Sequence, residues 1–310
     1  MTDPRQLARS IFDAGVAAAD PAQAVIRHLA DVRQTPALIV AVGKAAMRMA
    51  AAAMAAYRRV PCIIVTNYEN ADVMDGARVF AAGHPVPDAA GARAAQAVIA
   101  ALQDATGPVL VLVSGGGSAL LPAPAATLTL ADKAAVNTAL LASGLDIAVM
   151  NMIRQQLSDL KGGGMLRQTV HPVTAMILSD VVGDDLAVIA SGPTAAPIGT
   201  PATAIKALQG AGVWRALPAA VRAHLEGAQA PATLPEAHNI LVGSNGQSVK
   251  AMLAAYDGAR AIADPVEGDV AAAAKLICDQ AGMGVTVWGG ETTVQIKGTG
   301  KGGRNQELAL

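Results

Sequence analysis

The chain has few aromatic side chains. Only 2% of its 310 residues are Phe, Trp or Tyr, whereas 53% are hydrophobic. Ala, Val, Leu, Ile and Met must therefore fill the core, and this length suffices for one large domain or two ordinary ones. No apolar run reaches about 18 residues without a charge or a glycine cluster, and the first residues lack the pattern of a signal peptide. We therefore expect no membrane span and a cytoplasmic protein.

An excess of charge of one sign is also lacking. The 23 basic and 24 acidic residues give a formal net charge of -1, with no long run of either sign. This balance excludes the electrostatic footprint of a nucleic-acid-binding or membrane-surface protein and favours small-molecule partners. The two cysteines, Cys62 and Cys278, form no CxxC or metal-spaced pair, so we interpret both as core thiols. The oligomeric state stays open, a homo-oligomer included.

The main feature of the sequence is a set of strand-like apolar runs, each followed directly by a glycine-rich turn. They occur as LIVAVGKAA, VLVLVSGGGSA, AMILSDVVGDD and TTVQIKGTGKGGRNQE. In an open α/β sheet, ligands bind at the carboxyl ends of the strands, and free backbone N–H groups after such turns suit anions. The pattern predicts an α/β protein that binds phosphate or carboxylate.

The order of elements predicts the fold class. Strands expected at 37–42, 62–66 and 109–113 alternate with helices expected at 45–57, 89–105 and 130–142, which is typical of a mostly parallel, three-layer sheet. The proline-rich stretch 193–238 is interpreted as a domain connection, and a strand at 239–243 is expected to begin a second unit with strands at 285–288 and at TTVQIK. We predict two three-layer α/β/α domains: residues 1–235 with a Rossmann-like sheet, and residues 236–310 as an incomplete second domain. RNQELAL begins a helix where the sequence stops, so we expect a fragment.

Two of the glycine turns carry candidate anion ligands. Lys44 follows its strand at the start of a helix, where a cation is disfavoured unless an anion shares the site. The run Ser114, Gly115, Gly116, Gly117 and Ser118 can expose successive N–H groups beside two hydroxyls. The alternatives are a solvated lysine and a plain tight turn; the run is not a Walker A motif.

A third candidate lies in NMIRQQLSDLKGGG. There Arg154, Ser158 and Lys161 are spaced by four and three residues, which predicts one helical face with two cations and a hydroxyl. Such a face can clamp a carboxylate or a phosphate, with Arg binding bidentately. The alternative is a solvated amphipathic surface.

Acidic residues follow the next strand. Asp180, Asp184 and Asp185 are candidate Mg²⁺ ligands, because this ion needs only one or two carboxylates when substrate phosphates supply other ligands. One of the three could equally cap a helix.

The last loop, GTGKGG, fits the GxGxxG pattern of dinucleotide binding through Gly298, Gly300 and Gly303, with Lys301 and Gly302 between them. The cations Lys301 and Arg304 argue equally for phosphate. Glu291 is expected to orient one of these cations, to hold a metal, or to be a plain loop charge.

The chain contains a set of motifs in a fixed order: GKAAM, AGHPVPD, VSGGGSALL, IRQQLSDLKGG, LSDVVGDD with IASGPT, LVGSN, and GGETTV running into GKGGRNQELAL. Taken together, these motifs resemble the glycerate 2-kinase family with its MOFRL-type module, also labelled hydroxypyruvate reductase. The resemblance implies an ATP- and Mg²⁺-dependent enzyme that phosphorylates the 2-hydroxyl of D-glycerate. It implies that Lys44 and Arg304 are active-site cations.

We add further roles to those that the resemblance implies. Arg154 would hold the carboxylate, with Ser158 and Lys161 beside it; the Ser114–Ser118 loop would cradle phosphate or substrate, and Asp180 would bind Mg²⁺ or accept the proton. The residues assigned to ATP are Asn245, Glu291, Gly298, Gly300, Lys301, Gly302 and Gly303. Since the chain ends inside the MOFRL-like module, its own activity is left open.

Two other functions remain. An NAD(P)H-dependent hydroxypyruvate reductase would use GTGKGG as its dinucleotide turn, but the sequence offers no recognisable His with a carboxylate partner. A non-catalytic module that binds acidic metabolites would keep the glycine loops and dispense with Mg²⁺.

Overall fold

The structure, a computed structural model, describes residues 3–228, 233–262, 264–295, 297–298, 300 and 302–310. They fall into two compact units. One unit spans Ala24–Val242, and the other joins the described residues up to Gln23 with those from Gly243 onward. Each unit is described by itself below.

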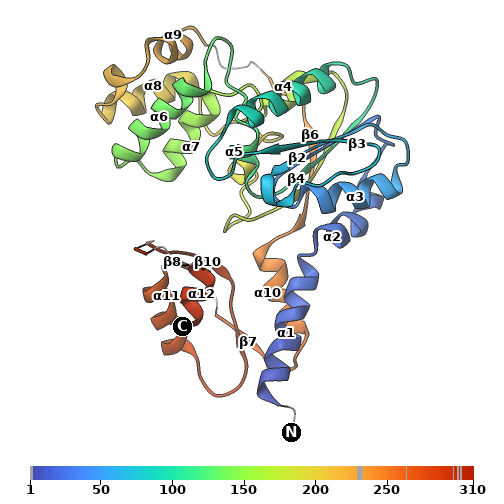
Figure 1. The fold of residues 1–310 in the computed structure, drawn as a ribbon. Coiled ribbons are helices and arrows are strands. Elements are labelled where there is room, and N and C mark those ends of the chain that lie inside the picture. Colours follow the sequence, from blue (N-terminus) through green and yellow to red (C-terminus); the bar gives the residue numbers. More distant parts are fainter. Residues whose placement is uncertain (1–2, 229–232, 263, 296, 299, 301) are drawn as a thin grey trace. The chain divides into compact units, whose positions relative to one another are not determined.

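A six-stranded sheet forms the centre of the Ala24–Val242 unit (Figure 1). Its strand order is β3-β2-β1-β4-β5-β6, which is the order of Rossmann-type sheets. The pairings from β3 through β5 are all parallel, so the predicted mostly parallel sheet is confirmed. The strands are β1 (Leu38–Val42), β2 (Cys62–Asn67), β3 (Ala77–Ala82), β4 (Val109–Val113), β5 (Val173–Leu178) and β6 (Ala237–Gly243).

Helices cover this sheet on both faces (Figure 1). Val40 of β1 and Val111 of β4 belong to one buried cluster with Val98 and Leu102 of α4 (Ala89–Gln103). On the opposite face, α3 (Ala46–Ala56) contacts β1 and β2. β1 and β4 are buried along their whole length because they are central strands between two helical layers.

A group of helices adjoins the sheet in the same unit and builds a second core cluster, which includes Val136, Ile153, Leu208 and Val221. These helices are α6 (Leu130–Ala142), α7 (Ile147–Gln156), α8 (Pro201–Gly210) and α9 (Ala219–Gly227). The expected domain connection at 193–238 is therefore wrong for much of its length, since α8 and α9 lie within this unit. The prolines misled the prediction: Pro201 opens α8 and Pro218 caps α9, and proline is well tolerated at helix starts.

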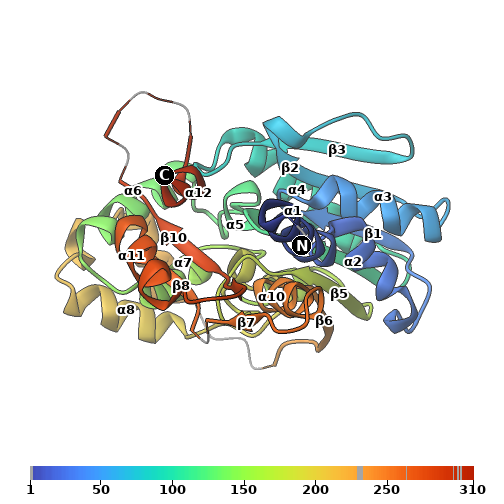
Figure 2. The same cartoon turned by 90° about the horizontal axis from the view of Figure 1, so that it is seen from below.

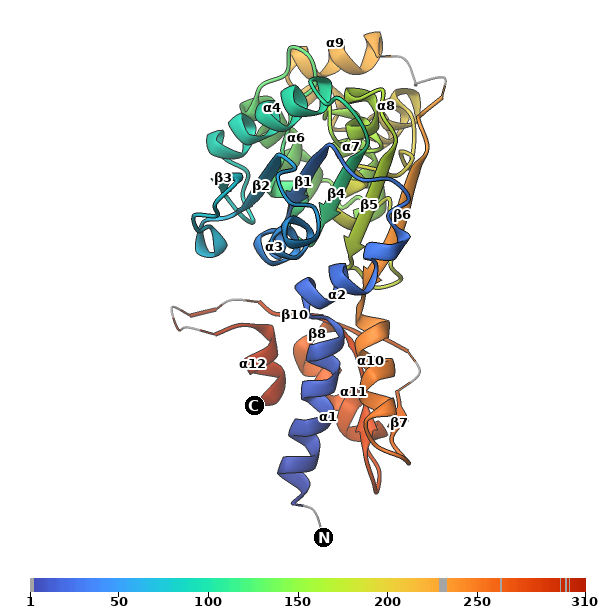
Figure 3. The ribbon, with the colours of Figure 1, turned by 90° about the vertical axis from the view of Figure 1, so that its right-hand side faces the viewer.

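Strand β6 also departs from expectation. The sequence predicted that this strand begins the second unit, whereas it lies beside β5 at the edge of the six-stranded sheet. The view turned about the vertical axis shows β6 next to β5 (Figure 3). A strand pairs with whichever neighbour its register fits, and the sequence around it does not reveal which sheet that is.

The other unit contains two small parallel pairs, β8 with β10 and β7 with β9. Its elements are α1 (Pro4–Ala18), α10 (Asn245–Ala254), β7 (Arg260–Ala261), β8 (Val266–Asp269), α11 (Val270–Gln280), β9 (Thr286–Val287), β10 (Gly290–Thr293) and α12 (Arg304–Ala309) (Figure 2). The sequence placed α1 with the first domain, but it packs on α10: a Cβ on Gly15 would lie 2.8 Å from Met252 Cγ. Helix α2 (Pro21–Arg27) follows α1.

The two cysteines differ in environment. Cys62 on β2 is buried, as expected, but Cys278 on α11 is exposed, so its interpretation as a core thiol is wrong. α11 is amphipathic, and Cys278 lies on its outer face while Val270 and Ala273 are buried. Within the described ranges, no helix is both long and apolar enough to cross a membrane.

Candidate active site

The carboxyl ends of β1, β4 and β5 bring three of the predicted turns together. The Lys44 N–H donates to the carbonyl oxygen of Gly115 at 2.8 Å, and the Ala45 N–H donates to Ser114 Oγ at 3.0 Å. A Cβ on Gly115 would lie 1.9 Å from Asp180 Oδ2, so this carboxylate lies directly against the Gly115 backbone. Lys44, the Ser114–Ser118 loop and Asp180, singled out separately in the sequence, thus share one edge of the sheet.

Glycine is required at the point where these turns meet. Gly43 has a φ of +121°, and a Cβ there would lie 2.2 Å from Ser114 Oγ. Helix α5 (Gly117–Leu120), which follows the loop, has only four residues. Its dipole adds little, so Lys44 and the N–H groups of the loop after Ser114 are the groups here that could bind an anion.

His84 joins this cluster, although the sequence analysis interpreted HPVP only as a rigid turn. A Cβ on Gly116 would lie 3.0 Å from His84 Cδ2 and 3.3 Å from Lys44 Cγ. Partial burial and the positive charge of Lys44 lower the pKa of His84, against the opposing charges of Glu69 and Asp180. The imidazole is therefore neutral at neutral pH. Its position just after β3 was the available signal, since the other site residues also follow strands.

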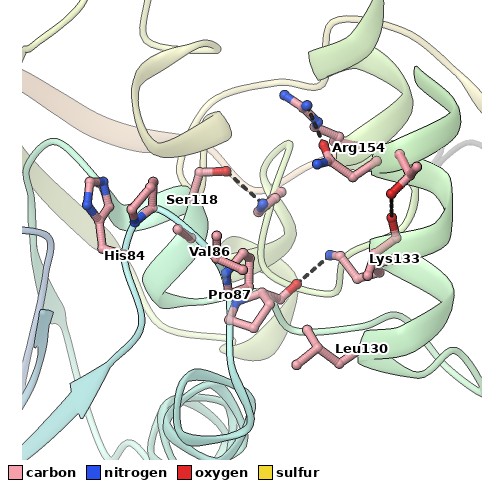
Figure 4. Close-up of a pocket in the computed structure, with 15 residues that line it drawn as sticks. His84, Val86, Pro87, Ser118, Leu130, Lys133 and Arg154 are labelled. Carbon is pink, nitrogen blue, oxygen red and sulfur yellow. Dashed lines mark hydrogen bonds between the residues drawn. The ribbon is translucent and has the colours of Figure 1, made fainter. Parts of the chain in front are cut away.

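A cavity of about 490 Å³ opens beside this cluster (Figure 4). His84 and Ser118 line one side of it, and Lys133 and Arg154 lie on the opposite side, on α6 and α7. The other lining residues are Pro85, Val86, Pro87, Gly116, Ala119, Pro122, Leu130, Ala134, Asn137, Thr138 and Lys161. Three of the lining side chains are lysine or arginine, and none of the described residues that line the cavity is Asp or Glu. This end of the site suits an anion.

The cations are held in different ways. Arg154 Nη2 donates to Asn137 Oδ1, and Nη1 donates to Asn151 Oδ1 at 3.3 Å; burial lowers the pKa of Arg154. Lys133 Nζ donates to the carbonyl oxygens of Pro122 and, at 3.1 Å, Leu157. Neutral amides and carbonyls orient these groups without cancelling their charge.

Lys161 is the most enclosed of the three cations, with 7% of its surface exposed. Its Nζ lies 2.8 Å from Ser118 Oγ, which is 2.9 Å from Ser191 Oγ. Burial, together with the charge of Arg154, lowers the pKa of Lys161 to about 7. The amine is therefore neutral in a large share of the molecules at neutral pH.

The predicted single helical face is wrong. Helix α7 ends at Gln156, so only Arg154 is on it, and Ser158 and Lys161 lie in the turns that follow. Ser158 is buried, donates to the carbonyl oxygen of Pro122 at 3.1 Å and is not part of the cavity lining. Arg154 and Lys161 still reach the cavity because the chain folds back after the helix.

The three aspartates do not gather into a metal site. Asp185 Oδ1 accepts the N–H of Ala187 at 2.8 Å, and Asp184 lies in a tight turn with a φ of +54°. The described part of the chain holds no group of three or more His, Cys, Asp or Glu that could hold a metal. Asp180 alone, beside the glycine loop, fits a Mg²⁺ ion whose other ligands come from phosphate oxygens and water.

The remaining predicted residues lie in the other unit. Arg304 Nη2 pairs with Glu291 Oε1 at 2.7 Å, so Glu291 contacts a cation of the last loop. A Cβ on Gly289 would lie 2.0 Å from Asn245 Oδ1, so Asn245 is close to the start of β10. Gly298, Gly300 and Gly302 have open space around them, Gly303 caps α12, and Lys301 lies outside the described residues.

Comparisons with known proteins show the family to which the chain belongs. Residues 7–226 match the family described as domain of unknown function DUF4147, and residues 284–310 match the MOFRL family. A protein named "Putative hydroxypyruvate reductase" from Agrobacterium vitis is 39% identical over 99% of this chain and 75% of its own length. "Glycerate 2-kinase" from Pyrococcus horikoshii is 33% identical over 99% of this chain and 78% of its own.

A solved structure gives the same result. The crystal structure of glycerate kinase from Thermotoga maritima superposes with a TM-score of 0.88, at 31% identity, over 98% of this chain and 78% of that one. Both the sequence and the fold are thus shared over nearly the whole chain. The chain belongs to the MOFRL-type glycerate 2-kinase family.

Proposed function

We propose that this protein is a D-glycerate 2-kinase, which transfers the γ-phosphoryl group of ATP to the 2-hydroxyl of D-glycerate. The observation that carries the proposal is the cavity with three cations and no lining carboxylate, next to the glycine loop, Lys44 and Asp180. A small acid fits its cationic end. Phosphoryl transfer requires positioning and charge stabilisation more than covalent chemistry, which is what such a site can supply.

The substrate carboxylate binds at Arg154. A guanidinium can meet both oxygens of a carboxylate at once, and Asn137 and Asn151 hold Arg154 in place without neutralising it. Partial burial strengthens the attraction because less water screens it. With the carboxylate fixed there, the hydroxyl on the adjacent carbon faces the Ser118 and His84 side of the cavity.

The transferred group binds at the sheet edge. Lys44 and the N–H groups of the loop that follows Ser114 stabilise the negative charge that the phosphoryl oxygens carry in the transition state. Asp180 would hold Mg²⁺, which neutralises charge on the nucleotide phosphates when bound. Arg304, oriented by Glu291, is the second cation assigned to the reaction, and Asn245, Gly298, Gly300, Gly302 and Gly303 are assigned to ATP.

Two groups can accept the proton of the attacking hydroxyl. The neutral imidazole of His84 is suited to this role, because its lowered pKa keeps it unprotonated at neutral pH. Asp180 is the alternative when it is not engaged by the metal. We further propose that the protein acts in the cytoplasm on small molecules, with a homo-oligomer as an open possibility.

The test is ³¹P NMR of D-glycerate with ATP and Mg²⁺. A 2-phosphoglycerate signal supports the proposal; a 3-phosphoglycerate signal contradicts its regiochemistry. Unchanged ATP, together with oxidation of NADH by hydroxypyruvate, would favour the reductase instead. Arg154→Met should abolish product formation, while Arg58→Met, which changes an exposed arginine, should not.

A further inference from the structure

Lys161 is buried without a counter-charge. Only 7% of its surface is exposed, and none of the ion pairs that the structure describes involves it. A buried ammonium ion without a carboxylate partner is costly, so such a group either loses its proton or receives an anion. Because Lys161 lines the cavity, an anionic ligand in the cavity can supply the missing negative charge.

The groups that face Lys161 add to this cost. Arg154 on α7 repels it, and Lys133 on α6 and Lys161 disfavour each other's charge. Asp159, two residues before Lys161, acts on Lys133 and favours that charge. The cavity also includes the neutral His84. Among these groups the positive charges outnumber the negative one.

The hydrogen bonds of Lys161 suit both protonation states. Its partner is the hydroxyl of Ser118, which in turn lies 2.9 Å from the hydroxyl of Ser191. A hydroxyl can accept from an ammonium ion or donate to a neutral amine. Lys133 donates to two carbonyl oxygens, which can only accept, and burial together with the charge of Lys161 lowers its pKa as well. Lys161 differs from Lys133 in that its partner is a hydroxyl, which can also donate to the lone pair of the neutral amine.

We propose that Lys161 is a proton-linked anchor for the substrate carboxylate: its amine, buried in the cavity lining without a counter-charge, takes up a proton from solvent when the acid binds beside Arg154. This inference rests on the proposed function, and it adds the way in which the site recognises the acid. No bond to carbon or phosphorus changes. The amine gains a proton, the buffer loses one, and the ammonium ion pairs with the carboxylate.

Two properties follow. The site selects acids over neutral polyols, because only an anion offsets the cost of charging Lys161. Affinity for the acid falls as pH rises above neutrality, since each binding event then requires a proton from a scarcer pool.

The test is titration calorimetry of the whole chain with D-glycerate in HEPES and in Tris, whose ionisation enthalpies differ. The difference in binding enthalpy gives the number of protons taken up. With the pKa of Lys161 at about 7 in the free protein, we expect uptake of most of one proton at pH 8 and of little at pH 6. This pH dependence is measured on the unaltered protein, so it does not depend on a variant that folds.

Variants identify the group that takes up the proton. Lys161→Arg keeps the positive charge but is protonated throughout, so it should bind D-glycerate with no uptake. Lys206→Arg, at an exposed position on α8, is the matched control and should behave as the unaltered protein. His84→Gln should retain the uptake.

The outcomes separate the two proposals. Binding without proton uptake, or uptake that persists in Lys161→Arg, overturns the role of Lys161 while leaving the kinase assignment intact. Absence of both D-glycerate binding and phosphorylation overturns the kinase assignment and this inference with it.

Discussion

Replacing Lys161 by Met should change how the stability of its unit depends on pH. The pKa of this lysine falls from 10.5 in the unfolded chain to about 7 in the folded one, chiefly because the side chain is buried. Between these two values the unfolded state binds more protons, so the free energy of unfolding rises with pH, by about 1.4 kcal/mol per unit for one group. Below about pH 7 both states are protonated, and the folded state bears the full cost of the buried charge.

The variant lacks this dependence. From pH 7.5 to pH 9 the unaltered protein should gain about 2 kcal/mol of stability relative to Lys161→Met, while at pH 6 the variant should be the more stable of the two. Lys133 is present in both proteins, so to first order its own titration cancels in the difference. The assay is urea unfolding followed by the fluorescence of Trp214, in a Trp288→Phe background that leaves this one tryptophan.

Lys206→Met controls for the loss of a lysine at an exposed site and should follow the unaltered protein at every pH. Parallel stability curves for Lys161→Met and the unaltered protein would refute the reasoning, because they would mean that burial does not perturb the amine.

Three further predictions concern the glycine turns and the thiols. Gly43→Ala should destabilise its unit by about 3 kcal/mol or more in urea unfolding, because the new Cβ would lie 2.2 Å from Ser114 Oγ and 2.4 Å from its carbonyl oxygen; Gly210→Ala, in open space, should not. Gly115→Ala should leave stability nearly unchanged, because Asp180 can move aside, yet lower kcat by about 10²-fold; unchanged kcat would mean that the Asp180 position is unimportant. Cys278 should react with Ellman's reagent in the folded protein, whereas Cys62, whose pKa burial raises to about 12, should react only after unfolding; rapid reaction of both thiols would contradict the burial.

Local patterns explain how much of the sheet could be predicted. The run Val109–Val113 is apolar at every position and ends in glycine, which indicates a buried parallel strand, and the structure has the strand at these residues. The helix expected at 130–142 is likewise confirmed, since Thr129 and Asp132 form a capping box at its start. Such signals lie within a few residues of the helix or strand that they define.

The same local patterns could not predict which segments far apart in the sequence contact each other. The spacing of Arg154, Ser158 and Lys161 fits a helix, but α7 ends at Gln156 because the following residues bond elsewhere: the Asp159 N–H, for example, donates to the Ala123 carbonyl. His84 becomes part of the site because it lies close to Gly116, which is 32 positions away in the sequence. Chemistry-bearing residue types could be found from the sequence, whereas their assembly depends on contacts between distant segments.

The difference in charge between the two sides of the cavity has a consequence for regiochemistry. The side with Lys133 and Arg154 carries cations and no lining carboxylate, while the side at His84 adjoins both Lys44 and Asp180. Under the proposed function, an acid anchored at Arg154 presents the hydroxyl of its adjacent carbon toward the mixed side, where Lys44 would stabilise an incoming phosphoryl group. In-line transfer tolerates little displacement, so under the proposed function the anchoring of the carboxylate would decide which hydroxyl is phosphorylated.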